Sequence, residues 1–489
     1  MPSDDQRMSR RSFLKRTAAV SAGTIGARGI YELLDTLAGP GPQRVEAATS
    51  TRPQEQYLIQ NLQAITDNGV SVVIPPLHAD VITARLAPGR TWNATTLKSA
   101  QTRLENALQT LETAYPPTAA GLTIVVGWGL PYFQTYVSKP WSTYQPMDTE
   151  SNQPAMLDAI RFPSDPSDLT LEDNHVVFKI RSDSQNTLTQ VAAALFTNST
   201  SKAFIGSLFD ITSIRHGFLG RGFGTTSIAK GLAQAAGVAN WEQIPDNAQL
   251  MMGFTSTQQA ANGPGNIVNF ETLGLTNQSP SSYFAHGCTM HLSHLYEDLS
   301  LWYGGSNTSY PSRSYGERVA RMFSPHTKVP ADGTVTLSNG PDDVSTLGQI
   351  KQDAANGLLG HTAPLQLVTR LKTDTTDIYG QFRPAGTPIP IREDFNTLDD
   401  PFYSSGSPAN KPGLHFVVFV PTSNRFHKTR LAMDGLVPDG NGGTIDLRAD
   451  YNLTPAQVGI QTMTQSTHRQ NFLVPPRAHR SFPLAELLR

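Results

Sequence analysis

Leu122-Thr123-Ile124-Val125-Val126 is a short β-branched run that Gly127 closes. A run of this length and composition, ended by glycine, predicts a buried strand. Upstream of it, leucines recur at helical spacing between Thr95 and Tyr115, which predicts an amphipathic helix. The segment Val70 to His78 predicts an earlier strand.

Downstream of this run, the pattern continues with a strand from His175 to Ile180 and a helix from Asn186 to Phe196. The order is therefore strand, helix, strand, then strand and helix again. This order is typical of a ferredoxin-like domain, so we expect one such domain in the first half of the chain.

The second half repeats this order with longer insertions. We expect a strand from Cys288 to His294 that runs into a helix ending near Trp302-Tyr303. The clearest strand, Gly413 to Pro421, leads into a helix from Asn424 to Met433. Between them, the Gly-, Ser-, Asn- and Pro-rich segments Gly304 to Pro311 and Lys328 to Asp343 predict surface loops. The predicted fold class is α+β, with two ferredoxin-like halves, antiparallel sheets and long loop insertions.

These patterns divide the chain into four parts. We expect a leader at 1–47, an N-terminal half at 52–250, a C-terminal half at 251–470, and a C-terminal strap at 471–489. The strap contains two adjacent prolines and mixes aromatic with basic residues.

The leader carries a twin-arginine export signal, Ser9-Arg10-Arg11-Ser12-Phe13-Leu14-Lys15. A weakly apolar run from Thr17 to Ala27 follows it, and Val45-Glu46-Ala47 is a small-residue cleavage pattern. The alternative is a basic N-terminus followed by a surface helix. The leader predicts export by the twin-arginine translocase to a periplasmic, cell-surface or extracellular location. Because that translocase carries folded chains, a bound metal, haem or flavin becomes more plausible.

Composition and charge narrow the classes of function. Residues 1–47 hold seven basic and five acidic side chains, so removing them changes the formal net charge from −2 to −4. This charge argues against a nucleic-acid partner. The mature chain contains no run of about 18 apolar residues, so we expect no membrane-spanning helix in it. Cys288 is the single cysteine, so an intramolecular disulfide is excluded.

Several segments share their order and spacing with one known family. They are Gly121 to Gly129, Leu250 to Thr257 followed by Ala261-Asn262-Gly263-Pro264, Gly287 to Trp302, and Gly413 to Phe419. In this respect the chain resembles the dye-decolourising (DyP-type) haem peroxidase superfamily over most of its mature length. The resemblance implies a dimeric α+β barrel type of fold, a haem b cofactor, and oxidation of a small organic reductant by peroxide. It also implies a possible homo-oligomer.

The resemblance also implies two site residues. His361 matches the proximal ligand of the haem iron, and Arg383, which lies 22 residues later, matches the distal arginine. Imidazole is a usual axial ligand of peroxidase iron, and a guanidinium can stabilise charge as the peroxide bond breaks. The alternatives are a helix-start or loop histidine after Gly360 and an ordinary surface arginine.

The chain departs from the family pattern at the distal acid. Ser256 stands where the family has an aspartate, and a hydroxyl cannot carry the proton between peroxide oxygens except by relaying it through water. Pro421-Thr422-Ser423 also stands where a second acid is expected. Glu271 or Asp298 could replace the lost carboxylate. A haem-free relative that acts as a binding or structural protein is therefore an alternative function.

A second alternative is copper binding. If the segment from His286 to His294 is extended, His286, Cys288, Met290 and His294 lie on one face. Thiolate, thioether and imidazole ligands suit copper. Four ligands on one strand span too far to close on one ion, so at most two neighbours could bind it without outside help. A core strand with a buried cysteine and a gap-filling methionine is the competing interpretation.

Overall fold

The computed structural model describes residues 52–67, 70–219, 227–246, 248–253, 262–303, 346–357, 359–398 and 411–489. The predicted leader, both predicted surface loops and Ser256 lie outside these ranges.

The first half is a four-stranded antiparallel sheet with two helices. Its strands are ordered β9-β3-β8-β4. One helix connects β3 to β4 and the other connects β8 to β9. The elements are β3 (His78–Leu86), α3 (Ala94–Ala114), β4 (Thr123–Trp128), β8 (Val176–Ser182), α6 (Gln185–Phe196) and β9 (Phe209–Phe218).

The second half has the same arrangement, with strands ordered β14-β15-β10-β18. Helices again connect the first strand to the second and the third to the fourth. The elements are β10 (Cys288–Glu297), α8 (Leu299–Tyr303), α10 (Leu347–Ala355), α11 (Thr362–Thr369), β14 (Phe395–Thr397), β15 (Gly413–Val420), α12 (Ser423–Met433) and β18 (Thr464–Val474).

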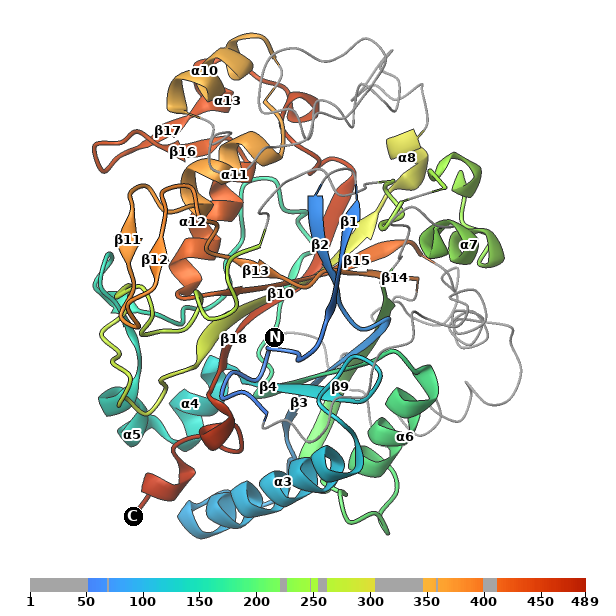
Figure 1. Ribbon diagram of the computed structural model, residues 1–489, viewed down its shortest axis with the longest axis vertical. Helices are drawn as coiled ribbons and strands as arrows, with labels where there is room; N and C mark the ends of the chain where they lie inside the picture. Colours follow the sequence, from blue (N-terminus) through green and yellow to red (C-terminus); the bar gives the residue numbers. More distant parts are fainter. Residues whose placement is uncertain are drawn as a thin grey trace.

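The two sheets join edge to edge into a closed ring of eight strands. β14 meets β9 through the pair Asn396 and Phe218, and β18 meets β4 through the pair Leu473 and Trp128. Figure 1 shows the strands crossing the centre of the molecule, with α3 and α6 against one part of the ring and α12 against another. The prediction of an α+β fold with two ferredoxin-like halves is confirmed.

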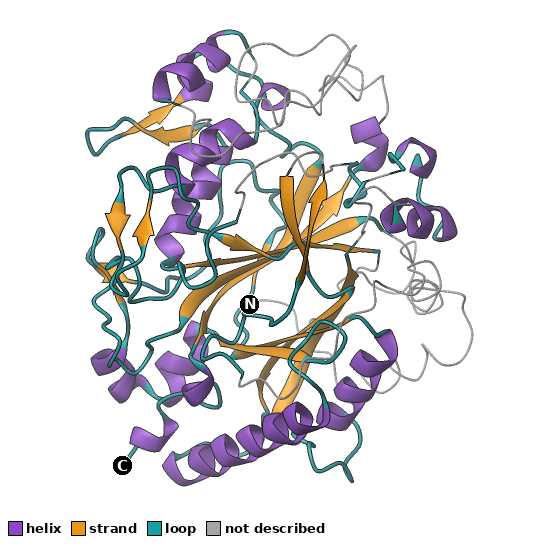
Figure 2. Cartoon of the chain, viewed as in Figure 1, coloured by secondary structure: helices purple, strands orange, loops and turns teal. Residues whose placement is uncertain are grey.

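Alternation along the strands divides the core between the inside and the outside of the ring. Val81, Val125, Val177 and Phe419 belong to a cluster that fills the inside. A larger apolar cluster packs the outer face of the first half against α3 and α6. The helices therefore cover the outer faces of the strands (Figure 2). A site that lies between these helices and the sheet is therefore separated from the interior of the ring.

Shorter elements complete the described chain, and among them no helix is long and apolar enough to cross a membrane. They are β1 (Gln63–Asp67), β2 (Val70–Ile74), α4 (Leu130–Tyr136), α5 (Ser138–Tyr144), β5 (Met147–Asp148), β6 (Gln153–Pro154), β7 (Thr170–Leu171), α7 (Ile228–Ala235), β11 (Thr375–Thr376), β12 (Phe382–Arg383), β13 (Ile391–Arg392), β16 (Leu436–Pro438), β17 (Thr444–Asp446) and α13 (Leu447–Asp450). Short 3-10 helices lie at Trp241–Gln243, Pro455–Gln457, Arg477–His479 and Ala485–Leu487.

The helix predicted at Thr95 to Tyr115 is confirmed as α3, whose Asn93 cap accepts a hydrogen bond from the Thr96 amide. The strand predicted from Val70 to His78 is wrong in extent. Residues 70–74 pair only with β1 in a separate ribbon, and the first strand of the ring begins at His78.

Two long strands were not predicted, β9 and β18. β9 carries Arg215 and His216, and β18 carries the polar run before Phe472, so neither presents an apolar pattern. The predicted division at residue 470 falls inside β18. Residues beyond that strand pack on the first half, where the Trp128 indole donates a hydrogen bond to the Arg480 carbonyl.

Candidate functional site

His361 immediately precedes helix α11, which packs against α12. The segment that leads to it is held in place because Leu359 forms a parallel bridge with Val458. The Leu359 carbonyl also accepts a hydrogen bond of 3.0 Å from the Gly459 amide. The imidazole therefore projects from a fixed backbone beside the second-half sheet.

Burial and two nearby arginines lower the pKa of the His361 imidazole. Burial lowers the pKa of His361 to about 3, and the positive charges of Arg392 and Arg430 lower it further in the same direction. Nδ1 of His361 is buried and has no hydrogen-bond partner among the described residues. The side chain is thus a neutral imidazole with an unpaired nitrogen, which is the state that a metal ligand requires.

Arg392 belongs to the outer face of the sheet. It is the cross-strand partner of Val418 on β15, and Val418 packs against Phe426 of α12. Paired residues share a face of the sheet, so Arg392 lies on the same side as α12. His361, Arg392 and Arg430 therefore converge on the space between the helices and the outer face of the ring.

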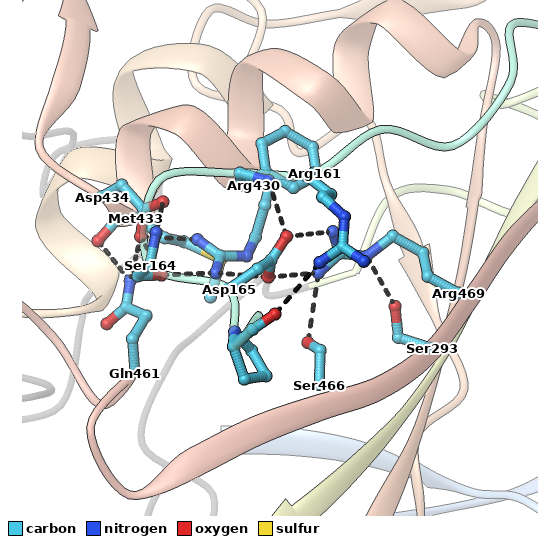
Figure 3. Close-up of polar contacts among 12 residues, drawn as sticks. Arg161, Ser164, Asp165, Ser293, Arg430, Met433, Asp434, Gln461, Ser466 and Arg469 are labelled. Carbon is cyan, nitrogen blue, oxygen red and sulfur yellow. Dashed lines mark hydrogen bonds and ion pairs between the residues drawn. The ribbon is translucent and has the colours of Figure 1, made fainter. Parts of the chain in front are cut away.

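A buried charge network lies next to this space and is drawn in Figure 3. Asp165 accepts two hydrogen bonds from Arg469, of 2.6 and 2.8 Å, and one of 3.3 Å from Arg430. The Phe162 amide donates to the same carboxylate at 2.6 Å. Burial alone would raise the pKa of Asp165, but its hydrogen bond and ion pair with Arg469 lower it below its usual value.

Asp434 extends the network to the end of α12. Its carboxylate accepts a hydrogen bond of 2.6 Å from Arg430 and one of 2.6 Å from the Ser164 hydroxyl. Gln461 reaches the same carboxylate at 3.3 Å. The loop from residue 160 to 166, which comes from the first half, is thereby fixed against α12 and β18 of the second half.

Two further buried histidines stand beside these charges. The His291 ring stacks on Phe426 at 3.5 Å between centroids, and its nitrogens contact Asn471 and Ser293. Burial lowers the pKa of His427 to about 4, and the charge of Arg469 adds to this effect. Nε2 of His427 has no hydrogen-bond partner among the described residues. The region therefore contains three neutral imidazoles.

An open cavity of about 700 Å³ borders the network. Asp434, Ser164 and Gln461 form its polar side, while Leu453 and Val458 belong to its apolar wall. Since Val458 bridges to Leu359, the cavity adjoins the segment that positions His361.

Arg383, the predicted distal arginine, contacts residues other than His361. Its guanidinium forms a buried ion pair of 2.6 Å with Asp377 and donates to the Asn266 amide oxygen at 2.6 Å. No contact joins it to His361 within the described ranges, where the arginines that influence His361 are Arg392 and Arg430. The role of Arg383 as distal arginine and that of Ser256 remain predictions.

The four residues of the copper alternative are dispersed. Cys288 and Met290 pack among apolar side chains inside the ring. His286 contacts Glu55 at 3.1 Å, and His294 contacts Thr467 at 2.8 Å. In the part of the chain that is described, no group of three or more His, Cys, Asp or Glu side chains could hold a metal ion. Among the described residues these four side chains do not form one ligand set, and the copper alternative stays a prediction.

The two candidate replacement acids are also engaged elsewhere. Glu271 is buried and accepts hydrogen bonds from the His286 amide and the Tyr379 hydroxyl. Asp298 accepts one from the Leu301 amide at the start of α8. Neither carboxylate contacts His361 among the described residues.

Sequence reasoning missed Arg392, Arg430, Asp165 and Asp434. One signal was available, because Arg430 of the predicted helix stands four residues before Asp434, which directly follows that helix, and side chains at this spacing face each other. Asp165 gave no signal, since its partner Arg469 is 304 residues away.

Comparison with solved structures gives the fold class. A DyP-type peroxidase from Cellulomonas bogoriensis is 15% identical with a TM-score of 0.54, and the match covers 89% of this chain and 96% of that one. The encapsulated DyP-type peroxidase from Mycobacterium smegmatis is 16% identical with a TM-score of 0.46, covering 83% and 95%. The match to the Cellulomonas bogoriensis structure shows that the chain has the fold of the DyP-type peroxidases.

A model of a sequence family also matches the chain. A family of unknown function (DUF7405) matches residues 76–476, so the chain belongs to that family. No curated protein matches it.

Proposed function

We propose that this chain is an exported, haem-binding relative of the DyP-type peroxidases, with His361 as the axial ligand of the iron. The observation that carries the proposal is the half-buried imidazole of His361, whose Nδ1 is buried and has no hydrogen-bond partner among the described residues, in a chain with this fold. Bound haem would supply an iron that reacts with peroxide and withdraws electrons from an organic molecule.

The surrounding side chains fit such a group in charge. Arg392 and Arg430 place positive charge beside His361, which would favour the carboxylates of haem. Asp434 holds Arg430 through an ion pair of 2.6 Å and so fixes the position of one of these charges. The adjoining cavity of about 700 Å³ could admit a small organic reductant.

Peroxidase turnover is proposed to be weak. Ser256 would replace a carboxylate that moves a proton, and a hydroxyl performs that step only through water. The acid that would polarise the ligand histidine also has no counterpart, since Pro421-Thr422-Ser423 stands where it is expected. The proposed role is therefore haem binding with slow peroxide chemistry.

One observation favours the haem-free alternative. Arg383, which the resemblance assigns to the distal side, is bound to Asp377 and Asn266. Under this alternative the chain keeps the barrel and acts outside the cytoplasm as a binding or structural protein.

The test is the absorption spectrum of protein produced with haem supplied. We expect a Soret band in the parent chain, its loss or shift in His361→Ala, and its retention in His479→Ala. His479 is a matched control because it is partly exposed and lies near the C-terminus, stacked on Tyr283. No Soret band in the parent would refute haem binding, and a band unchanged in His361→Ala would refute His361 as ligand.

Export has its own test. The proposal requires that replacing Arg10 and Arg11 by lysine retain the protein in the cytoplasm. Equal amounts of mature protein outside the cytoplasm with and without these arginines would refute the twin-arginine route.

A further inference from the structure

A wide-open polar surface cavity of about 500 Å³ lies between α3 and the loop that follows α6, away from the site described above, and most of its lining side chains are exposed. One wall is a single face of α3, where Ser99, Thr102, Arg103 and Asn106 stand three or four residues apart. The other wall is formed by Ser199, Ser201, Lys202 and Phe204.

The cavity contains two cations and no carboxylate among its lining residues. Arg103 and Lys202 form no ion pair with any described acidic side chain. The cavity therefore presents uncompensated positive charge on a chain whose net charge is negative.

Several polar groups in the cavity are also without a partner in the described chain. The side chains of Ser99, Asn106 and Ser199 and the Lys202 ammonium are exposed and form no hydrogen bond with described residues. These groups can donate hydrogen bonds, and the hydroxyls and the amide oxygen can also accept them. They match a ligand with an anionic group and several hydroxyls.

The cavity is held in shape before any ligand binds. Nε and Nη2 of Arg103 donate to the Phe204 carbonyl at 3.1 and 2.9 Å, and the guanidinium lies over the Phe204 ring at 5.7 Å. The loop is closed by hydrogen bonds from the Phe204 amide to the Ser201 carbonyl and from the Ile205 amide to the Leu195 carbonyl. A preformed site loses little entropy on binding.

We propose that this cavity binds an acidic sugar, that is, a ring with hydroxyls that bears an oxyanion. Arg103 and Lys202 would pair with the oxyanion, while Ser99, Asn106 and Ser199 would bond to the hydroxyls. A volume of about 500 Å³ suits a mono- or disaccharide unit. A phosphorylated sugar and a uronic acid carry this same chemistry.

Titration calorimetry of the purified full chain tests the proposal with glucose 6-phosphate, glucuronate and glucose as probes. We expect both acidic sugars to bind and glucose to bind at least about tenfold more weakly, since charge-assisted bonds are absent. Which acidic sugar binds more tightly identifies the source of the oxyanion. Added salt should weaken both.

Two variants make the assignment specific. Lys202→Gln should weaken binding of the acidic sugars about tenfold without affecting the fold, because this exposed side chain has no described contact. Lys372→Gln, which removes an exposed charge elsewhere, should leave binding unchanged. The proposal is overturned if neither acidic sugar binds at millimolar concentration, if glucose binds equally well, or if Lys202→Gln binds like the parent.

Discussion

Asp165→Asn is the substitution that tests most directly how the two halves are held together. Asp165 lies in the first-half loop, and its partners Arg430 and Arg469 belong to α12 and β18 of the second half. The Arg469 and Asp165 side chains are 1% and 2% exposed. Asparagine keeps the size of the side chain but removes its charge.

The magnitude follows from what remains behind. Arg430 would keep Asp434, but Arg469 would lose its only carboxylate partner within the described chain and stay buried with a positive charge. Removing one member of a buried ion pair costs about 3–5 kcal/mol. One asparagine oxygen can still accept a hydrogen bond, so we expect a loss of about 3 kcal/mol in the free energy of unfolding.

The assay is urea unfolding followed by tryptophan fluorescence, with Glu150→Gln as the control. Glu150 pairs with Arg425 and Lys428 of the same helix, but its side chain is 43% exposed. The control should therefore lose less than about 1 kcal/mol. If Asp165→Asn loses no more than the control, the buried network does not hold the halves together. The double variant Asp165→Leu with Arg469→Met should lose less than Asp165→Asn alone, because it leaves no unpaired charge at this contact.

Three further substitutions test other parts of the structure. In Gly217→Ala the new Cβ would lie 1.9 Å from the Phe395 ring, so we expect a loss of about 1–3 kcal/mol in unfolding free energy; Gly348→Ala, which meets nothing closer than 3.9 Å, should show no loss. Burial raises the pKa of Glu297 to about 8, so its contribution to stability falls as pH rises from about 4.5 toward 8. Glu297→Gln should therefore stabilise the protein by about 2–4 kcal/mol at pH 8 and leave its stability unchanged near pH 4. Urea unfolding midpoints measure this difference. Equal effects of the substitution at both pH values would contradict the prediction. Burial lowers the pKa of His294 to about 3, so the parent should lose stability as pH falls below about 6.5, and His294→Asn should reduce that slope by about 1.4 kcal/mol per pH unit. An unchanged slope would show that His294 is not buried as a neutral imidazole.

The sequence predicted the fold class because each half carries strands and helices with clear periodicity. The run at Leu122 and the strand at Gly413 are apolar on both faces and were found. β18 was missed because its inner and outer positions both carry polar groups, such as His468 and Arg469, whose partners lie on other strands. Pairing over such distances leaves no local pattern.

The site around His361 could be predicted only in part, because its residues are also far apart in the sequence. His361 was identified by resemblance, but its environment is assembled from α11, α12 and β13, and only the fold brings Arg392 near it. The position of Arg383 could not be checked from the sequence, because its pairing with Asp377 arises from the short β11 and β12 hairpin.

The separation of the ring interior from the outer face has a consequence for function. Val417 and Phe419 of β15 point into the ring and pack with Val81 and Val177, whereas Val418 between them faces α12. The apolar interior that stabilises the barrel is therefore distinct from the surface next to His361. A haem-free chain would keep this interior intact, because the Lys179 ammonium that lies over the Phe419 ring inside it is already paired with Glu393. We accordingly expect His361→Ala to abolish haem binding while its far-ultraviolet circular dichroism stays that of the parent. Loss of the fold together with haem would show that the proposed site and the barrel are energetically one unit.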